Sequence, residues 1–128
     1  MYMEATGGQP GWRARMILPE IPWNGDEKCL SFRLNLVGYY QGSLYVRDQD
    51  GVILWKKIGR SSSDPNNQVS WVTYSVTLHS NMSFVVLEGY RGGNSYDDDV
   101  GDVALDDLRI DSNSCKNIIL FIEIEKLY

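Results

Sequence analysis

Carboxylates are concentrated in one part of the chain, because residues 90–107 read YRGGNSYDDDVGDVALDD and include six aspartates. Such a density suits calcium, which takes about six to eight oxygen ligands. The stretch does not match an EF-hand loop, because aligning Gly101 with the loop glycine puts Tyr96 and Val100 where aspartates are required. Residues 97–99 follow Gly, Asn and Ser, so we predict that they form a solvated acidic loop.

Asp106 is harder to explain as a solvated side chain. The segment DVALDDLRI alternates as a β-strand would, and this spacing puts four residues on one face: Ala104, Asp106, Leu108 and Ile110. A carboxylate on that apolar face is costly unless it is paired, hydrogen-bonded or metal-bound. Glu88 raises the same question, because it ends the apolar segment FVVLEG and Arg91 follows three residues later.

Two interpretations of these carboxylates stay open. In the first, Arg91 forms a buried ion pair with Glu88 or Asp106 and pins the following loop to the domain. In the second, a cation is held by Asp106 together with Asp102 or Glu88. We expect no required cofactor, and calcium is the one candidate ion.

Catalysis is the remaining chemistry that paired carboxylates can perform. Glycoside hydrolysis needs two carboxyl groups about 5–10 Å apart, and Glu88 and Asp106 lie on separate predicted strands that could meet. The single histidine, His79, lies beside a predicted turn at Ser80-Asn81, and no Ser-His-Asp or Cys-His grouping is present. We therefore predict no catalytic residue and no enzyme, with a glycosidase fragment as the distant alternative.

The two cysteines, Cys29 and Cys115, are far apart in the sequence and belong to no CxxC pair. With one histidine in the chain, a zinc site is poorly supported. The residues by themselves leave two alternatives open, namely two buried free thiols in a cytosolic protein or one long-range disulfide.

Composition excludes several classes of partner. The net charge of −5 argues against nucleic-acid binding, which relies on basic patches. The basic residues are scattered, and no apolar run reaches the ~20 residues of a membrane span, so we expect no direct membrane insertion. The start, MYMEATGGQPGW, lacks the basic and apolar regions of a signal peptide.

Period-two patterning runs through most of the chain. In CLSFRLNL, four apolar residues share one face: Leu30, Phe32, Leu34 and Leu36. Asp50-Gly51 marks a hairpin between SLYVRD and VILWKKI, and VSWVTYSVTLH and MSFVVLEGYRG give two more strands. No sustained helical period is present. We therefore predict an all-β antiparallel sandwich or barrel, with weaker strands near residues 2–5 and 14–18.

Several motifs occur together in an order that resembles a known family: CLSFRLNLVGYYQGSLYVRDQDG, SWVTYSVTL, FVVLEGYRGG, GDVALDDLRI and a closing cysteine. They resemble the MAM domain, the extracellular module named for meprins and receptor-type tyrosine phosphatases. The resemblance covers roughly residues 2–115. It implies an antiparallel β-sandwich of jelly-roll type, a disulfide between Cys29 and Cys115, and a role in adhesion and in homophilic or heterophilic association.

The ends of the chain depart from the family pattern. Family members usually begin several tens of residues earlier, with an acidic-aromatic strand and a small cysteine loop that this sequence lacks. We therefore expect one MAM-like domain over residues 1–115 without that N-terminal strand. The tail, residues 116–128, matches nothing in the family and is interpreted as an added strand, a junction to another module or a gene-model artefact.

The expected function follows from the resemblance: a non-catalytic adhesion or protein-interaction module in the ectodomain of a secreted or membrane-anchored protein. Its expected partners are other proteins, second copies included, and neighbouring domains of a larger chain. Asn81-Met82-Ser83 is an N-glycosylation sequon that suits this location. Tyrosines in or beside turns are typical of protein contacts and of sugar platforms, so a carbohydrate-binding jelly roll is the alternative function. They are Tyr39, Tyr40, Tyr90 and Tyr96.

Overall fold

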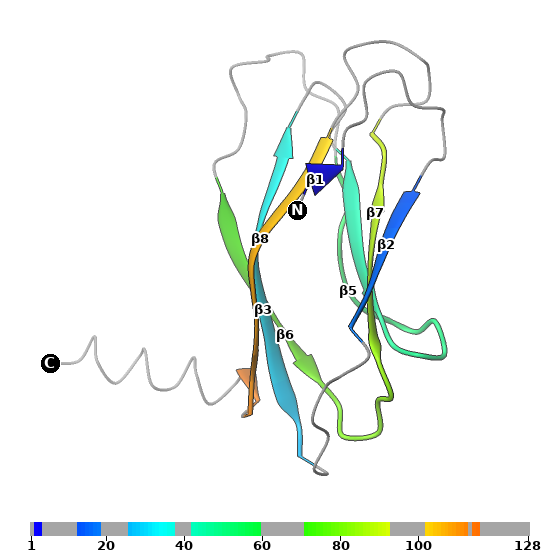
Figure 1. Cartoon of the computed structure of the whole chain (residues 1–128), viewed down its shortest axis with the longest axis vertical. Helices are drawn as coiled ribbons and strands as arrows, with labels where there is room; N and C mark the ends of the chain where they lie inside the picture. The colour runs from blue at the N-terminus through cyan, green and yellow to red at the C-terminus, as the bar shows by residue number, and fades with distance from the viewer. Residues whose placement is uncertain are drawn as a thin grey trace, which may run out of the picture.

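The chain forms a β-sandwich of two four-stranded antiparallel sheets, seen as two layers in a computed structural model (Figure 1). The structure describes residues 2–3, 13–18, 26–37, 42–59, 71–92, 102–112 and 114–115. Its strands are β1 (Tyr2–Met3), β2 (Arg13–Leu18), β3 (Lys28–Val37), β4 (Ser43–Arg47), β5 (Ile53–Lys57), β6 (Val72–Leu78), β7 (Val85–Tyr90) and β8 (Asp102–Asp111). The predicted all-β, jelly-roll-type sandwich is confirmed.

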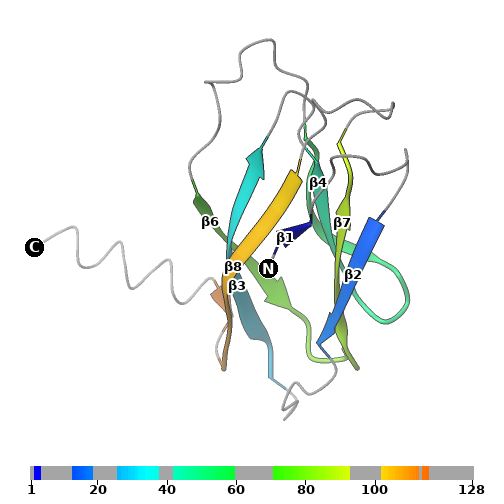
Figure 2. The same ribbon diagram turned by 45° about the horizontal axis from the view of Figure 1, so that its top comes forward.

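Each sheet is built around two central strands. One sheet has the order β1-β8-β3-β6, and the other has the order β2-β7-β4-β5. In the second sheet β7 pairs with both β2 and β4, and the tilted view shows β2 lying beside β7 (Figure 2). Across the described ranges no helix is long and apolar enough to cross a bilayer.

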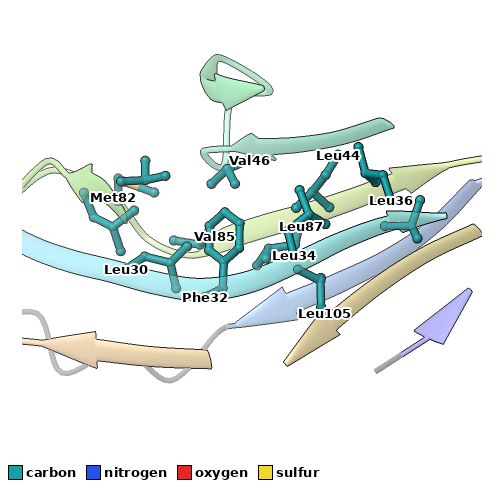
Figure 3. Close-up of a cluster of buried hydrophobic side chains, with 13 residues drawn as sticks. Leu30, Phe32, Leu34, Leu36, Leu44, Val46, Met82, Val85, Leu87 and Leu105 are labelled. Atoms are coloured by element: carbon teal, nitrogen blue, oxygen red, sulfur yellow. The ribbon is translucent and has the colours of Figure 1, made fainter. Parts of the chain in front are cut away.

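The apolar faces of the strands meet between the sheets, as the period-two pattern predicts (Figure 3). Leu30, Phe32, Leu34 and Leu36 of β3 are all at most 5% exposed. Phe32 lies near the centre of this core, with its ring edge-on to Trp55 at 5.2 Å between centroids. Because one face of each strand packs in this core, the alternate residues of the same strand lie on the outer face of its sheet.

The Cys29–Cys115 disulfide that the resemblance implies is present, with a Cα–Cα distance of 4.8 Å. Cys29 lies at the start of β3, opposite Asp111 at the end of β8. The bridge spans 86 residues of sequence, so it closes the segment from β3 to β8 into one covalent loop. In the chain-entropy account such a loop destabilises the unfolded state by about 4–5 kcal/mol.

Strand β8 contains a β-bulge that overturns one prediction. Ser31 lies opposite Arg109 and Arg33 opposite Asp106, so β8 carries one more residue than β3 between these pairs. Asp107 adopts a left-handed conformation with φ 52°, as a bulge residue often does. The extra residue inverts the alternation, so that Asp106 is exposed. The prediction that Asp106 shares a buried face with Leu108 and Ile110 was therefore wrong.

Candidate functional site

The outer face of the sheet β2-β7-β4-β5 gathers long polar and aromatic side chains. Inward residues of these strands pack in the core, so the alternate residues point away from it. We call the following set the arginine face: Arg13, Arg15, Tyr45, Arg47, Lys56, Glu88 and Tyr90.

The strand register places these side chains in rows. Arg15 lies opposite Glu88, Glu88 opposite Tyr45, and Tyr45 opposite Lys56. Arg13 lies opposite Tyr90 in the neighbouring row. Directly opposed residues of antiparallel strands have Cβ atoms about 4.5–5.5 Å apart, so long side chains in one row touch.

Glu88 is the centre of this arrangement, and its side chain is only 1% exposed. One carboxylate oxygen, Oε2, is bound by Arg15 Nε and lies 3.7 Å from Arg13 Nη1. The other, Oε1, lies 3.5 Å from Arg47 Nε and accepts a hydrogen bond from the Tyr90 hydroxyl. Guanidinium groups from two strands and a phenol from β7 therefore hold one carboxylate.

These contacts keep Glu88 ionised. Burial by itself raises the pKa of the Glu88 carboxyl, because it penalises the charged form. Hydrogen bonds from Tyr90 and Arg15, with the charges of Arg15 and Arg13, outweigh burial and hold that pKa below its ordinary value. The cluster is therefore a fixed carboxylate under positive side chains and cannot readily exchange a proton near neutral pH.

Aromatic contacts and a hairpin fix the other members of the face. The rings of Tyr45 and Tyr90 pack edge to face at 5.3 Å, and the Arg47 guanidinium lies 5.1 Å from the Tyr45 ring. Arg47 Nη1 also donates to the Gly51 carbonyl at 3.1 Å. The face is thus ordered by contacts among its own side chains.

The β4–β5 turn at this edge is the hairpin predicted from Asp50-Gly51. Gly51 has φ 81°, which favours glycine, and its N–H donates to the Asp48 carbonyl. The buried Asp48 carboxylate accepts from the N–H groups of Asp50 and Val52 at 2.9 Å and lies 3.3 Å from His79 Nε2. His79 thus supports a turn.

Two of the residues predicted for an ion pair or a cation, Glu88 and Asp106, lie in different sheets. Glu88 pairs with Arg13, Arg15 and Arg47, because β2 and β4 flank it in the sheet. Asp106 belongs to the opposite sheet and is exposed, so the predicted burial of its carboxylate was wrong. Among the described residues no group of three or more His, Cys, Asp or Glu side chains is placed to hold a metal. The calcium site stays a prediction.

Other predicted features lie at turns or outside the described residues. Asn81 is exposed in the turn between β6 and β7, so its side chain is accessible for the predicted glycosylation. The Asp102 side chain, the acidic stretch 97–99, the tyrosines 39, 40 and 96, and the tail 116–128 lie outside the described set.

Sequence reasoning missed Arg13, Arg15 and Arg47 as members of a site. The available signal was alternation: in RARMIL, Arg13 and Arg15 share one face while Met16 and Leu18 share the other. Their position opposite Glu88 depends on strand pairing, which alternation does not specify.

Similarity to known proteins agrees with this architecture. A cleaved adhesin domain of Lys-gingipain from Porphyromonas gingivalis has the same fold, with a TM-score of 0.58 at 16% identity, covering 77% of this chain and 63% of that one. In sequence, the chain is 28% identical to Neuropilin-1a of Danio rerio over 88% of its length, and 24% identical to Neuropilin-1 of Homo sapiens over 88%. It is 27% identical to Thyroid hormone-induced protein B of Xenopus laevis over 85%.

These relatives are much longer proteins, and the chain spans 12% of each neuropilin and 16% of the Xenopus protein. The profile of one family, the MAM domain (meprin/A5/mu), matches residues 1–116 and so includes both cysteines of the disulfide. This chain belongs to the MAM domain family.

Proposed function

We propose that this chain is a non-catalytic protein-interaction module of an extracellular or cell-surface protein, and that it binds partner proteins through the arginine face. The observation that carries the proposal is the clamping of Glu88 by three arginines and Tyr90. Arginine and tyrosine are the residues that most often dominate protein interfaces. Side chains already ordered in the free protein lose less entropy on binding.

The family and the relatives support an extracellular interaction role. The similar proteins include two neuropilins, and the similar fold belongs to a domain described as an adhesin. A disulfide that encloses most of the domain also suits an oxidising compartment, because cytosolic thiols are kept reduced. Adhesion to other proteins, including second copies of the chain, belongs to the proposal, as do neighbouring domains of a longer protein.

The charge state of Glu88 supports a binding role over a catalytic one. A general acid near neutral pH needs a raised pKa, whereas the arginines and Tyr90 lower the pKa of Glu88. Its suggested glycosidase partner, Asp106, lies on the opposite sheet. The proposal therefore assigns the arginine face to recognition and assigns no catalytic residue.

A glycan placed on the arginine face tests this function without assuming what the partner is. Lys56→Asn combined with Ile58→Thr creates a sequon whose asparagine lies on β5, and Lys56 and Ile58 are both exposed. Thr73→Asn creates a sequon with Ser75 on the outer face of the other sheet, and Thr73 is also exposed. The second variant is the matched control, because it carries one glycan on the opposite side of the sandwich.

The variants are secreted as dimeric fusions, and their binding to cultured cells is measured by flow cytometry before and after protease treatment of the cells. We expect protease-sensitive staining that is lost with the β5 glycan and kept with the Thr73→Asn glycan. Staining that survives the β5 glycan, or that is insensitive to protease, overturns the proposal.

A further inference from the structure

The arginine face differs in charge from the protein as a whole. The chain carries a net charge of −5, yet this face combines three arginines and Lys56 with one central carboxylate, Glu88. Asp48 and Asp50 of the β4–β5 turn line a hollow with Arg15, Arg47 and Glu88, and Asp48 already accepts two backbone hydrogen bonds. The positive part of the face is therefore its centre and the end near Arg13 and Tyr90.

We infer that the partner segment bound by the arginine face is acidic, a stretch of protein chain that carries aspartate or glutamate side chains beside apolar ones. This inference rests on the proposed function and adds the chemistry of the partner. Its basis is the orientation of the guanidinium groups together with the exposed apolar residues that flank them.

Two of the arginines, Arg13 and Arg15, contact Glu88 in a way that leaves them suited to a second carboxylate. Arg15 and Arg47 approach Glu88 through Nε, and Arg13 approaches through Nη1. The Arg13 and Arg15 side chains are 50% and 53% exposed although they contact a buried carboxylate. A guanidinium group has five donors in a planar fork, so its outer edge can bind an incoming carboxylate bidentately.

Two surface hollows on this sheet give such a segment places to bind. One is lined by Ser43, Tyr45, Arg47, Ile53, Lys56 and Tyr90. The other also includes Arg47, and it is lined by Arg15, Ile17, Val86 and Glu88 together with the turn carboxylates Asp48 and Asp50. Arg47 lines both hollows, so one extended segment could place side chains in each of them.

Exposed apolar side chains favour a protein segment over a sulfated sugar. Ile17 and Ile53 are 54% and 42% exposed, and each lines one of the two hollows. Val86 lies opposite Ile17 in the same row. A polyanionic sugar gains little from aliphatic contacts, whereas a peptide with apolar residues beside its carboxylates buries this surface.

The test uses a fluorescein-labelled peptide of Glu-Glu-Leu repeats, with a Gln-Gln-Leu peptide and a heparin-derived oligosaccharide as comparison probes. The binding variant is Arg13→Gln with Lys56→Gln, which leaves Arg15 and Arg47 on Glu88. Its matched control is Arg109→Gln with Lys57→Gln, which makes the same change in net charge. Arg109 lies exposed on β8, and Lys57 points to the opposite side of β5 from Lys56.

Fluorescence anisotropy should show that the intact chain binds the acidic peptide, and that added salt weakens the complex. The Arg13/Lys56 variant should lose roughly tenfold or more in affinity, and the control should stay within about twofold of the intact chain. Equal losses in both variants, equal binding of the Gln-Gln-Leu peptide, or binding of the oligosaccharide alone would each overturn the inference. Lys56→Glu, at an exposed position, is a second variant with a smaller demand on folding and should also weaken binding.

The two proposals fail in different ways. If the β5 glycan abolishes cell staining while the Arg13/Lys56 variant keeps it, the arginine face is an interface but its partner is not acidic. If the acidic peptide binds but the β5 glycan leaves staining unchanged, the proposed function fails.

Discussion

The outer faces of both sheets carry carboxylates and arginines, but the carboxylates differ in how exposed they are to solvent. On β2-β7-β4-β5 the Glu88 carboxylate is 1% exposed beneath three arginines. On β1-β8-β3-β6 the carboxylates of Asp106 and Asp107 are exposed, and Asp107 pairs with an Arg109 side chain that is 68% exposed. The exposure and pairing of a carboxylate on this sandwich therefore depend on the side chains of the neighbouring strands.

Strand neighbours explain the difference. Glu88 lies in a central strand and has Arg15 opposite it on β2 and Tyr45 opposite it on β4. Asp106 has Arg33 opposite it on β3, whereas the described β1 reaches only Val103 and Ala104 of β8. Side chains from both neighbouring strands cover Glu88, and nothing comparable covers Asp106 within the described strands.

The two sheets are also secured differently, and the largest predicted effect concerns the covalent tie. The sheet that contains β3 and β8 carries the disulfide at its end, with Cys29 fully buried. Replacing both cysteines, Cys29→Ala with Cys115→Ala, should lower the free energy of unfolding by about 3–5 kcal/mol, because the unfolded chain regains the entropy of a long open loop.

Urea unfolding measures this loss, and reduction of the intact chain should reproduce it. The loss should be the same at low and high salt, because the constraint is covalent. A loss below about 1 kcal/mol would contradict the chain-entropy account for this sandwich.

The second prediction compares the two carboxylates directly. Glu88→Gln should lower the free energy of unfolding by about 2 kcal/mol, because three arginines lose the charge that compensates them. Asp106→Asn should change it by no more than about 0.5 kcal/mol, since that side chain is exposed. Chemical denaturation at neutral pH measures both. Equal changes in the free energy of unfolding would mean that the burial of Glu88 does not make its charge more important for stability than that of Asp106.

The third prediction concerns the bulge that exposes Asp106. Asp107→Val should cost about 1–2 kcal/mol, because a β-branched residue is strained at the left-handed φ of 52°. Asp107→Asn should cost much less, because asparagine tolerates that conformation. Both variants remove the ion pair with Arg109, so the difference between their melting temperatures isolates the backbone effect. Indistinguishable melting would show that the bulge imposes no conformational requirement at Asp107.

This bulge is also the point at which alternation in the sequence no longer predicts which residues are buried. Alternation correctly placed Leu30, Phe32, Leu34 and Leu36 in the core, because β3 is regular along that segment. In β8 the same rule placed Asp106 on the wrong face, because one inserted residue inverts the alternation. No residue type in the sequence identifies the position of this insertion. Asp107 is of a residue type that tolerates left-handed backbone, but most aspartates do not adopt it.

The candidate site could be predicted only in part for a different reason. Glu88 stands out in the sequence because a carboxylate ends an apolar strand, and that signal is local. Its partners come from β2 and β4, 73 residues away in the case of Arg15, and alternation gives no register between distant strands. The sequence therefore favours the nearby Arg91 as a partner, whereas the sheet brings distant arginines to Glu88.

The smallest predicted effect is a pH dependence of the stability difference between the intact chain and Glu88→Gln. The pKa of Glu88 is lowered in the folded protein, so its stabilisation is present above the unfolded pKa of about 4.3 and is lost as the pH falls through the lower folded value. Protonated Glu88 resembles glutamine. The difference in free energy of unfolding between the intact chain and Glu88→Gln should therefore shrink as the pH falls from 7 to 3.

Asp106→Asn, which changes an exposed carboxylate on the other sheet, provides the control variant. Asp48 also has a lowered pKa: burial raises it, but hydrogen bonds from Val52, His79 and Asp50 outweigh burial. Its contribution is common to all three proteins and cancels in the differences. Urea titrations at several pH values measure these differences. A Glu88→Gln difference that stayed constant with pH would show that the arginines do not stabilise the ionised carboxylate.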